Sequence, residues 1–525
     1  MSHSNRRDVI QGAGAALLAV LAHPHLARAA APTLSFGQPF EFGYEALVDR
    51  AREMAATPYA AAPIVAPDVI EAIDYDTHGK LRYRPDEAVF GDGSGNYPVT
   101  FFHVGRYFAR GVKMHTLMDG HARQVRYSPE LFDMPADSVA KQLPSDVGFA
   151  GFRFQESRSR DDWRTQDWLA FLGASYWRAI GDLGQYGLSA RGVAIDSATP
   201  GPEEFPEFRE FYLTPAARKD DPNVILALLD GPGITGAYRI TARRTKGVVM
   251  EVEARLFLRR DIERLGIAPL TSMYWYGESN AEISSDWRPE IHDSDGLAIW
   301  TGNGERIWRP LTNPRVPNVS SFLDENPKGF GLMQRDRNFE HYLDGVYYDR
   351  RPSLWIEPVG DWGRGSVQLM ELRTDDEIHD NIGAFWVPEG PARAGNSYTF
   401  KYRQYWQTDM PTPPRPVAVC VSTRLGHGGR PGQTRQTDAR KFVVEFDGPA
   451  LSALKDGEEP EAVVAASSGR VDDAFAEKVP GTKRWRIIFD LYPNVPDPSE
   501  LRAFLRTDAG ALTETWLYRY DPLPR

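Results

Sequence analysis

The chain has 525 residues and a single cysteine, Cys420, which excludes an intramolecular disulfide and a thiolate metal cage. No apolar run after the first thirty residues approaches the length that spans a bilayer, so we expect no stable membrane insertion. The net charge of −11 argues against nucleic acid as a partner, which requires a concentrated basic surface. Phosphate-binding loops, a G-x-S-x-G elbow and metal-type histidine spacings are also absent, so we expect no cofactor and no metal.

The first thirty residues are typical of an export signal. Arg6 and Arg7 precede a short Ala/Gly-rich apolar stretch, and "ARA" at 27–29 offers small residues at the two recognition positions of a signal peptidase. Paired arginines indicate a twin-arginine signal over residues 1–29, a type that exports folded proteins. We therefore expect a periplasmic protein.

After the first thirty residues, alternation of apolar and polar residues with a period of two dominates the sequence. Val248, Met250 and Val252 alternate with Glu251 and Glu253, which predicts a half-buried antiparallel strand, and "SVQLMEL", "YTFKYRQYW", "KFVVEFDG" and "RWRIIFDLY" repeat the pattern. Helical periodicity is scarce and predicts one amphipathic helix in "YEALVDRAREMAA". A mainly β protein built from antiparallel sandwiches follows.

The Pro-rich stretch "TDMPTPPRP" cannot continue a strand ladder and predicts a linker at residues 408–416. Residues 30–407 then form a large β domain, and residues 417–525 have the size and short strands of an immunoglobulin-like sandwich. Within it, residues 423–440 are polar and Gly-rich and predict a long loop. Such a loop could reach a neighbouring site or a second copy of the chain in a homodimer.

Two groups of acidic residues next to aromatic segments are the candidates for chemistry. "RPEIHDSDG" carries Glu290, Asp293 and Asp295, and "DDEIHDN" carries Glu377 and Asp380. Aromatic faces stack on sugar rings and carboxylates accept hydroxyl hydrogen bonds, so this pairing favours a saccharide cleft. Glycosidic cleavage needs two carboxyl groups, one protonated to release the leaving oxygen and one to handle the proton of water. Each single acid is also typical of a turn, and each tryptophan of a core.

Three long motifs carry a family resemblance: "WRPEIHDSDGLAIWTGNGERIWRPL", "GFGLMQRDRNFEHYLDGVYYDRRPSLWIEP" and "GDWGRGSVQLMELRTDDEIHDNIGAFWVPE". They resemble the periplasmic glucan biosynthesis proteins over essentially the whole chain after the signal. The resemblance implies a galactose-mutarotase-type β-sandwich followed by an immunoglobulin-like domain. It also implies action on linear β-1,2-glucan by an inverting endo-glucanase.

The resemblance places Asp380 on the general acid, Glu377 in support of it, and Asp293 on the base side, acting through water and a substrate hydroxyl. Asp295 stays an alternative to Asp293 because both lie in one short motif, and it is otherwise a candidate for substrate binding. Six further residues of these motifs are candidates for substrate binding, each with a core position as the alternative: His292, Trp300, Trp308, Arg309, Tyr348 and Trp355.

Three functions stay open. The same acid and base hydrolyse the glucan if water attacks, or close it into a ring through one α-linkage if a sugar hydroxyl of the same chain attacks instead. Hydrolysis is the favoured alternative. A noncatalytic glucan-binding subunit that assists a membrane glucan synthase is the alternative of another class, because aromatic clefts also bind sugars without cutting them.

Overall fold

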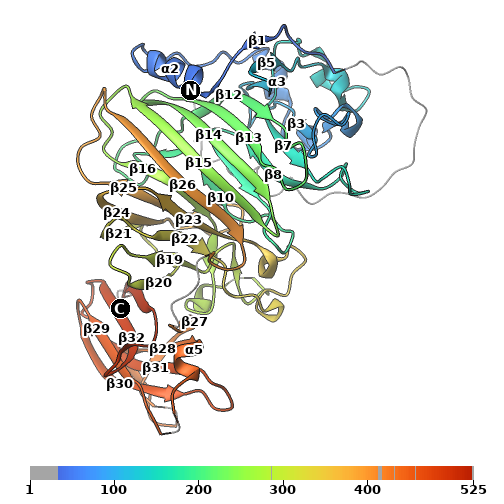
Figure 1. Ribbon diagram of the computed structural model, residues 1–525. Helices are drawn as coiled ribbons and strands as arrows, with labels where there is room; N and C mark the ends of the chain where they lie inside the picture. Colours follow the sequence, from blue (N-terminus) through green and yellow to red (C-terminus); the bar gives the residue numbers. More distant parts are fainter. Residues whose placement is uncertain (1–33, 285, 412–416, 431, 456, 523–525) are drawn as a thin grey trace.

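The computed structural model describes residues 34–284, 286–411, 417–430, 432–455 and 457–522. The proposed signal over residues 1–29 lies outside this range. The mainly β prediction is confirmed: two large sheets pack face to face and a smaller sandwich follows them (Figure 1). No helix in the described residues combines the length and apolar character needed to cross a membrane.

The first large sheet has 16 strands and runs through both halves of the molecule. Its members in spatial order are β1 (Phe40–Glu41), β5 (His121–Gln124), β4 (Lys113–Met118), β12 (Glu207–Thr214), β13 (Asn223–Asp230), β14 (Ile234–Arg244), β15 (Val248–Leu258), β26 (Ser397–Gln407), β23 (Ser353–Val359), β22 (Gly329–Met333), β19 (Gly296–Trp300), β20 (Arg306–Pro310), β34 (Thr515–Tyr520), β32 (Ser499–Thr507) and β29 (Glu461–Ala466), with β33 (Gly510–Ala511) beside β32.

The second large sheet has 10 strands and covers one face of the first, and the apolar side chains between the two sheets form the main core. Its members in spatial order are β21 (Asn318–Glu325), β24 (Arg364–Glu371), β25 (Ile382–Pro388), β16 (Leu265–Ser272), β10 (Ser189–Arg191), β9 (Tyr176–Ala179), β8 (Asp167–Leu172), β7 (Gly151–Gln155) and β3 (Val99–Phe102), with β11 (Val193–Ile195) beside β16.

The last hundred residues form the small sandwich. Its separate sheet is β27 (Val419–Gly428), β28 (Gln436–Asp447), β31 (Trp485–Tyr492) and β30 (Arg470–Lys478), and it packs on β29, β32 and β34. The facing sheet of this domain is therefore the end of the 16-stranded sheet, joined by β20 and β34. Of the predicted linker, residues 408–411 follow β26, and residues 412–416 lie outside the described residues.

The remaining elements are short. Two strand pairs, β17 (Tyr274–Tyr276) with β18 (Ile291–His292) and β2 (Arg82–Tyr83) with β6 (Phe132–Asp133), stand apart from the large sheets. The α-helices are α2 (Tyr44–Ala55), α3 (Pro67–Ala72), α4 (Tyr75–His78) and α5 (Pro449–Ser452). Single 3₁₀ turns are η1 (Pro85–Glu87), η2 (Pro129–Leu131), η3 (Val139–Gln142), η4 (Ala281–Ile283), η5 (Phe339–His341) and η6 (Tyr348–Arg350).

The predicted amphipathic helix is confirmed as α2. Its buried residues Leu47, Val48 and Ala51 pack on the outer face of β13 and β14, opposite the main core. The predicted strand at Val248 is β15, where even-numbered residues are buried, but Glu253 is buried as well. Glu253 is tolerated there because Arg239, Arg255 and Lys401 pair with it.

The predicted loop over residues 423–440 is wrong. β27 and β28 occupy most of it and pair as a long hairpin, with Leu425 opposite Phe442 and His427 opposite Arg440. A ladder needs only backbone hydrogen bonds, so polar and glycine-rich sequence continues it where the flanking strands already fix the register. Cys420 is buried in this domain, as predicted, with its thiol next to Thr423.

Candidate active site

A cleft of about 1030 Å³ lies on the face of the 10-stranded sheet that points away from the core. Strand alternation creates this face. In β9, Trp177 and Ala179 point into the core while Tyr176 and Arg178 line the cleft. β7 follows the same rule with Phe152 inward and Arg153 outward. The opposite wall comes from residues 73–83 and 106–112.

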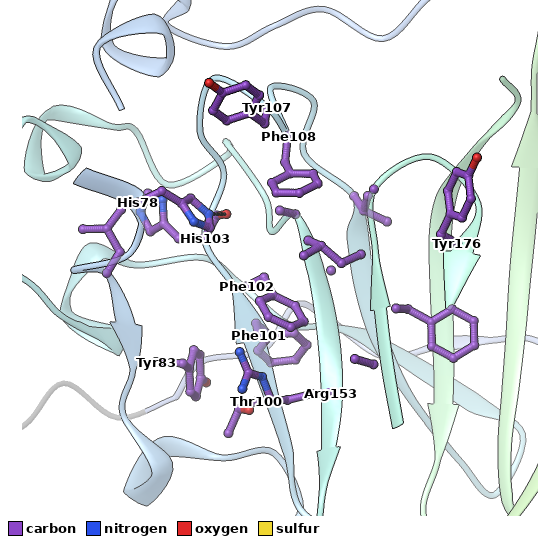
Figure 2. A pocket seen from close by; sticks show the side chains of 18 of the residues that line it. His78, Tyr83, Thr100, Phe101, Phe102, His103, Tyr107, Phe108, Arg153 and Tyr176 are labelled. Atoms are coloured by element: carbon purple, nitrogen blue, oxygen red, sulfur yellow. Dashed lines mark hydrogen bonds between the residues drawn. The ribbon is translucent and has the colours of Figure 1, made fainter. Parts of the chain in front are cut away.

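The cleft is lined by aromatic side chains from both walls. Figure 2 shows Tyr83, Phe102, Phe108 and Tyr176 around it, and the guanidinium of Arg153 lies 4.2 Å from the Phe102 ring centre. Flat apolar faces that alternate with hydrogen-bonding groups suit a chain of sugar rings. A cleft of this volume holds several rings rather than one.

Asp380 is the predicted acid that reaches this cleft. It ends the loop between β24 and β25, and the next residue, Asn381, fixes it from behind. The buried amide of Asn381 accepts from Tyr274 N at 2.8 Å and donates to Tyr274 O at 3.0 Å and Leu372 O at 2.8 Å. Three hydrogen bonds from this side chain to the backbone of Tyr274 and Leu372 anchor the position of Asp380, which is what a reacting group needs.

Burial raises the pKa of Asp380 above its ordinary value, and this effect outweighs the positive charges of Arg178, Arg351 and His379, which lower it. The carboxyl is only 11 % exposed, and Oδ2 lies 3.6 Å from Nη2 of Arg178. Arg178 is itself held by Ser189, to which its Nε donates at 2.6 Å. A carboxyl group whose protonated form is favoured can donate a proton to a leaving oxygen.

Glu377, three residues earlier in the same loop, has the opposite character. Burial would raise its pKa, but hydrogen bonds from Arg288 at 2.9 and 3.0 Å and from the Tyr348 hydroxyl at 2.6 Å lower it. Arg288 also binds Asp286 and Asp344, so it ties three loops together. Glu377 is therefore an ionised anchor of the loop that carries Asp380. Tyr348 is buried and reaches the site through this bond.

Asp293 lies in the turn between β18 and β19, is buried, and pairs with Arg351. It is not among the residues that line the cleft. Burial and the neighbouring charge of Arg178 lower the pKa of Arg351 to about 9, while Glu377 and Asp380 raise it. Arg351 is thus the electrostatic link between Asp293 and Asp380.

The other residues of this motif hold the turn. His292 contacts Gln334 at 2.9 Å and Glu290 at 3.0 Å through its two ring nitrogens. Oδ2 of Asp295 accepts from the backbone N–H groups of Arg335 and Asp336, both at 2.8 Å. Both side chains lie behind Asp293, away from the cleft lining.

Four predicted substrate-binding residues have core or interface positions instead. Trp308 and Trp355 are 4 % and 1 % exposed and belong to the core shared with the small sandwich. Arg309 is 1 % exposed and pairs with Glu371 at 3.1 Å. Trp300 packs at the edge of that core, with Arg306 3.5 Å from its ring centre. The rings of Trp308 and Trp355 therefore have no free surface for a glucan, while the Trp300 ring is half-buried.

Sequence reasoning missed the two arginines of the site. Arg178 stands in "YWRA", where strand alternation puts it on the same face as Tyr176 and opposite the core residue Trp177. Arg351 stands in the quoted motif "YYDRRPSLWIEP". A signal for the buried tryptophans was also present: a Cβ on Gly296 would lie 2.2 Å from the Trp308 ring, and one on Gly329 2.4 Å from the Trp355 ring.

The fold and the site define a mainly β protein with an aromatic-lined cleft and a buried acidic centre. The family model described as "Periplasmic glucan biosynthesis protein, MdoG" matches residues 42–520. The chain belongs to this family of periplasmic glucan biosynthesis proteins, which confirms the resemblance and the periplasmic location. It accordingly has a periplasmic role in glucan biosynthesis.

Curated relatives agree over nearly the full length. The chain is 54 % identical over 501 residues to glucans biosynthesis protein D 2 of Ralstonia nicotianae, covering 94 % of this chain and 93 % of the relative. It is 46 % identical over 530 residues to glucans biosynthesis protein D of Xanthomonas oryzae pv. oryzae, covering 99 % and 98 %. A solved polysaccharide lyase aligns with a TM-score of 0.24 and 11 % identity over 72 % of this chain and 45 % of the lyase, which supports no conclusion.

Proposed function

We propose that the protein is an inverting endo-β-1,2-glucanase that acts on the backbone of periplasmic glucans, with Asp380 as the general acid. The observation that carries this proposal is the environment of Asp380: a carboxyl that lines the cleft, is 11 % exposed, and has a raised pKa. Its task is to protonate the oxygen of the leaving sugar, which is a poor leaving group without that proton. The β-1,2 linkage rests on the family resemblance.

Asp293 is proposed on the base side. An inverting enzyme keeps its two carboxyl groups far enough apart for the attacking water. Asp293 lies behind Arg351 rather than in the cleft wall, which supports a base that takes the proton through water and a substrate hydroxyl. Glu377 keeps the acid loop in place through Arg288 and Tyr348.

The proposal extends to export and layout. Residues 1–29 act as a twin-arginine signal, residues 30–407 form the catalytic domain, and residues 417–525 form the immunoglobulin-like domain after the linker at 408–416. Glucan binds along the aromatic lining around Phe102, Phe108 and Tyr176.

Product analysis tests the function. Purified protein is incubated with linear β-1,2-glucan, and the products are measured by mass spectrometry and by their optical rotation, with Asp380→Asn as the inactive control. The proposal predicts shorter linear chains, whose mass exceeds that of a ring with the same number of glucose residues by one water. It also predicts that the new reducing ends are released as the α-anomer. Products without that water identify a cyclising transglycosylase, and an unchanged glucan that still binds identifies a noncatalytic subunit. Either result overturns the glucanase.

A further inference from the structure

The small sandwich is joined to the catalytic domain by a continuous sheet. β34 pairs in parallel with β20, with Ile307 opposite Thr515 and Trp308 opposite Trp516. The apolar cluster at this junction contains residues of both domains, among them Trp308, Trp355 and Trp516. A junction of this kind transmits the position of one domain to the other, because packed cores do not deform smoothly.

Arg335 crosses the junction with its side chain. Its guanidinium binds both carboxylate oxygens of Glu514, at 2.6 and 3.2 Å, and donates to the carbonyl of Cys420 at 3.1 Å. It also lies 3.6 Å from the ring centre of Trp308. Glu514 is 3 % exposed and accepts from the backbone N of Cys420 at 2.7 Å as well. A buried bidentate pair stacked on an aromatic ring has little freedom.

The backbone of the same arginine holds the base-side turn. The N–H groups of Arg335 and Asp336 both donate to Oδ2 of Asp295 at 2.8 Å. Within the described part of the chain, the buried Oδ1 of Asp295 has no hydrogen-bond partner. The orientation of this carboxylate therefore depends on the two N–H donors. Asp295 is two residues from Asp293, and the backbone N–H groups of both are fixed at 2.8 Å, to Met273 O and Met333 O.

We propose that Glu514 of the small sandwich is a positioning residue for the base side of the active site. It holds the Arg335 side chain, the Arg335 and Asp336 amides hold Asp295, and the turn through Asp295 sets the place of Asp293. The inference rests on the proposed function for its catalytic meaning. It gives the C-terminal domain a role in the reaction without any contact with substrate.

A second interdomain ion pair, more exposed than the first, provides a control. Glu305 of the catalytic domain accepts from Arg502 and from the Thr515 hydroxyl, both at 2.6 Å. It crosses the same junction, but it contacts none of the residues from Asp293 to Asp295. Its removal tests the cost of losing an interdomain contact as such.

The experiment compares Glu514→Gln with Glu305→Gln in the full chain, using two readouts. Hydrogen exchange of the peptide that contains the Arg335 and Asp336 amides needs no substrate, and it is expected to speed up about 10-fold or more in Glu514→Gln and to stay unchanged in Glu305→Gln. On linear β-1,2-glucan, the kcat of Glu514→Gln is expected to fall at least about 10-fold, while its KM stays within about twofold of the wild type. The reason is that misplacing a reacting group by a fraction of an ångström slows the chemical step.

The outcomes separate the two proposals. Unchanged exchange in Glu514→Gln, or equal kcat loss in both variants, overturns the positioning role. If Glu514→Gln lowers the melting temperature but leaves kcat per folded molecule unchanged, Glu514 is a structural contact only, and the positioning role is overturned as well. If Glu514→Gln does not fold, Arg335→Lys replaces it, because that variant keeps both backbone donors and loses the bidentate pair. A wild type that makes no product contradicts the glucanase, while the exchange result still decides the coupling.

Discussion

The two acidic loops of the site are held in opposite ways. The loop that carries Asp380 faces the cleft and is fixed from the side by Arg288, which binds Glu377. The turn that carries Asp293 is buried and is fixed from behind, by backbone donors of Arg335 and Asp336 acting on Asp295. In the proposed mechanism this difference fits the two roles, because Asp380 must touch the leaving oxygen in the cleft and Asp293 acts through water.

The same contrast appears within one loop. Asp380 has a raised pKa because burial is stronger than its cations, and Glu377 has a lowered pKa because Arg288 and Tyr348 hydrogen-bond its charged form. In the proposed mechanism, the carboxyl with the raised pKa is the acid and the one with the lowered pKa is the anchor. Both burial and hydrogen bonding separate them, because the Asp380 side chain is 11 % exposed and that of Glu377, which carries the hydrogen bonds from Arg288 and Tyr348, is 31 % exposed.

The largest effect is expected from Asp380→Asn. The amide cannot donate a proton of the required acidity, so kcat on linear β-1,2-glucan should fall about 10³-fold. Circular dichroism and gel filtration should match the wild type. The matched control is Asp375→Asn, an exposed carboxylate of the same loop that pairs with Arg373, and it should stay within about twofold. Comparable turnover of the two variants would remove Asp380 from the mechanism.

Trp355→Ala and Tyr176→Ala test whether the core and cleft aromatic residues have different roles. Trp355 is 1 % exposed, so its truncation should lower the free energy of unfolding by about 3–5 kcal/mol and leave KM of the folded fraction unchanged. Tyr176→Ala, on the cleft wall, should instead raise KM and have the smaller effect on unfolding. Denaturant titration and initial rates measure both. A raised KM in Trp355→Ala would return this residue to the substrate site.

Asp293→Asn and Asp295→Asn test which of the two carboxylates acts as the general base. Loss of a general base typically costs about 10²-fold, and this cost should fall on kcat of the Asp293 variant. Asp295→Asn keeps an oxygen for the Arg335 and Asp336 amides, so its loss should be smaller. Rates are compared at several pH values. The reverse order of the two variants would move the base to Asp295.

Glu377→Gln should have a moderate effect on both stability and kcat. It removes the charge from hydrogen bonds with Arg288 and Tyr348, and such bonds contribute about 1.5–3 kcal/mol. We expect a loss of that order in stability and a roughly tenfold lower kcat, because Asp380 is then held less firmly. Full activity with reduced stability would separate the anchor from catalysis.

The smallest effect concerns pH and stability. A raised native pKa means that ionised Asp380 costs folding free energy; the cost is present in full above the native pKa and absent below the ordinary value of about 3.9. Asp380→Asn should therefore have a higher free energy of unfolding than the wild type at pH 7, by about 1.4 kcal/mol for each unit by which the native pKa is raised, and should equal the wild type near pH 3. If Asp380→Asn were less stable than the wild type at pH 7, the neighbouring positive charges rather than burial would dominate the pKa of Asp380.

Much of this fold could be read from the sequence. The alternation at Val248 predicted β15, and the stripe through Leu47 and Ala51 predicted α2, because each element buries one face at a fixed period. The second half of β28, "KFVVEFDG", was predicted as a strand, but the part of the hairpin within residues 423–440 was not, since it is polar and Gly-rich and its backbone pairing is set by the neighbouring strands. Asp380 and Glu377 stood out as a loop before an aromatic strand.

The aromatic part of the site was less predictable. Trp308 and Trp355 stand in polar motifs that suit sugar stacking, and only the glycines across the sheet from them indicate burial. Arg178 comes from a strand distant in sequence from Asp380, so no local pattern connects them. Long-range pairing across β25, β16, β10 and β9 brings them together.

The central claim is that Asp380 donates a proton to the leaving oxygen, and the dependence of rate on the leaving group tests it most directly. Wild type and Asp380→Asn are compared on linear β-1,2-glucan and on a β-1,2-glucan oligomer whose reducing end is a 2,4-dinitrophenyl glycoside. The dinitrophenolate leaves without a proton, so the account predicts a loss of about 10³-fold on the glucan and less than about tenfold on the activated substrate. An equal loss on both substrates would contradict it.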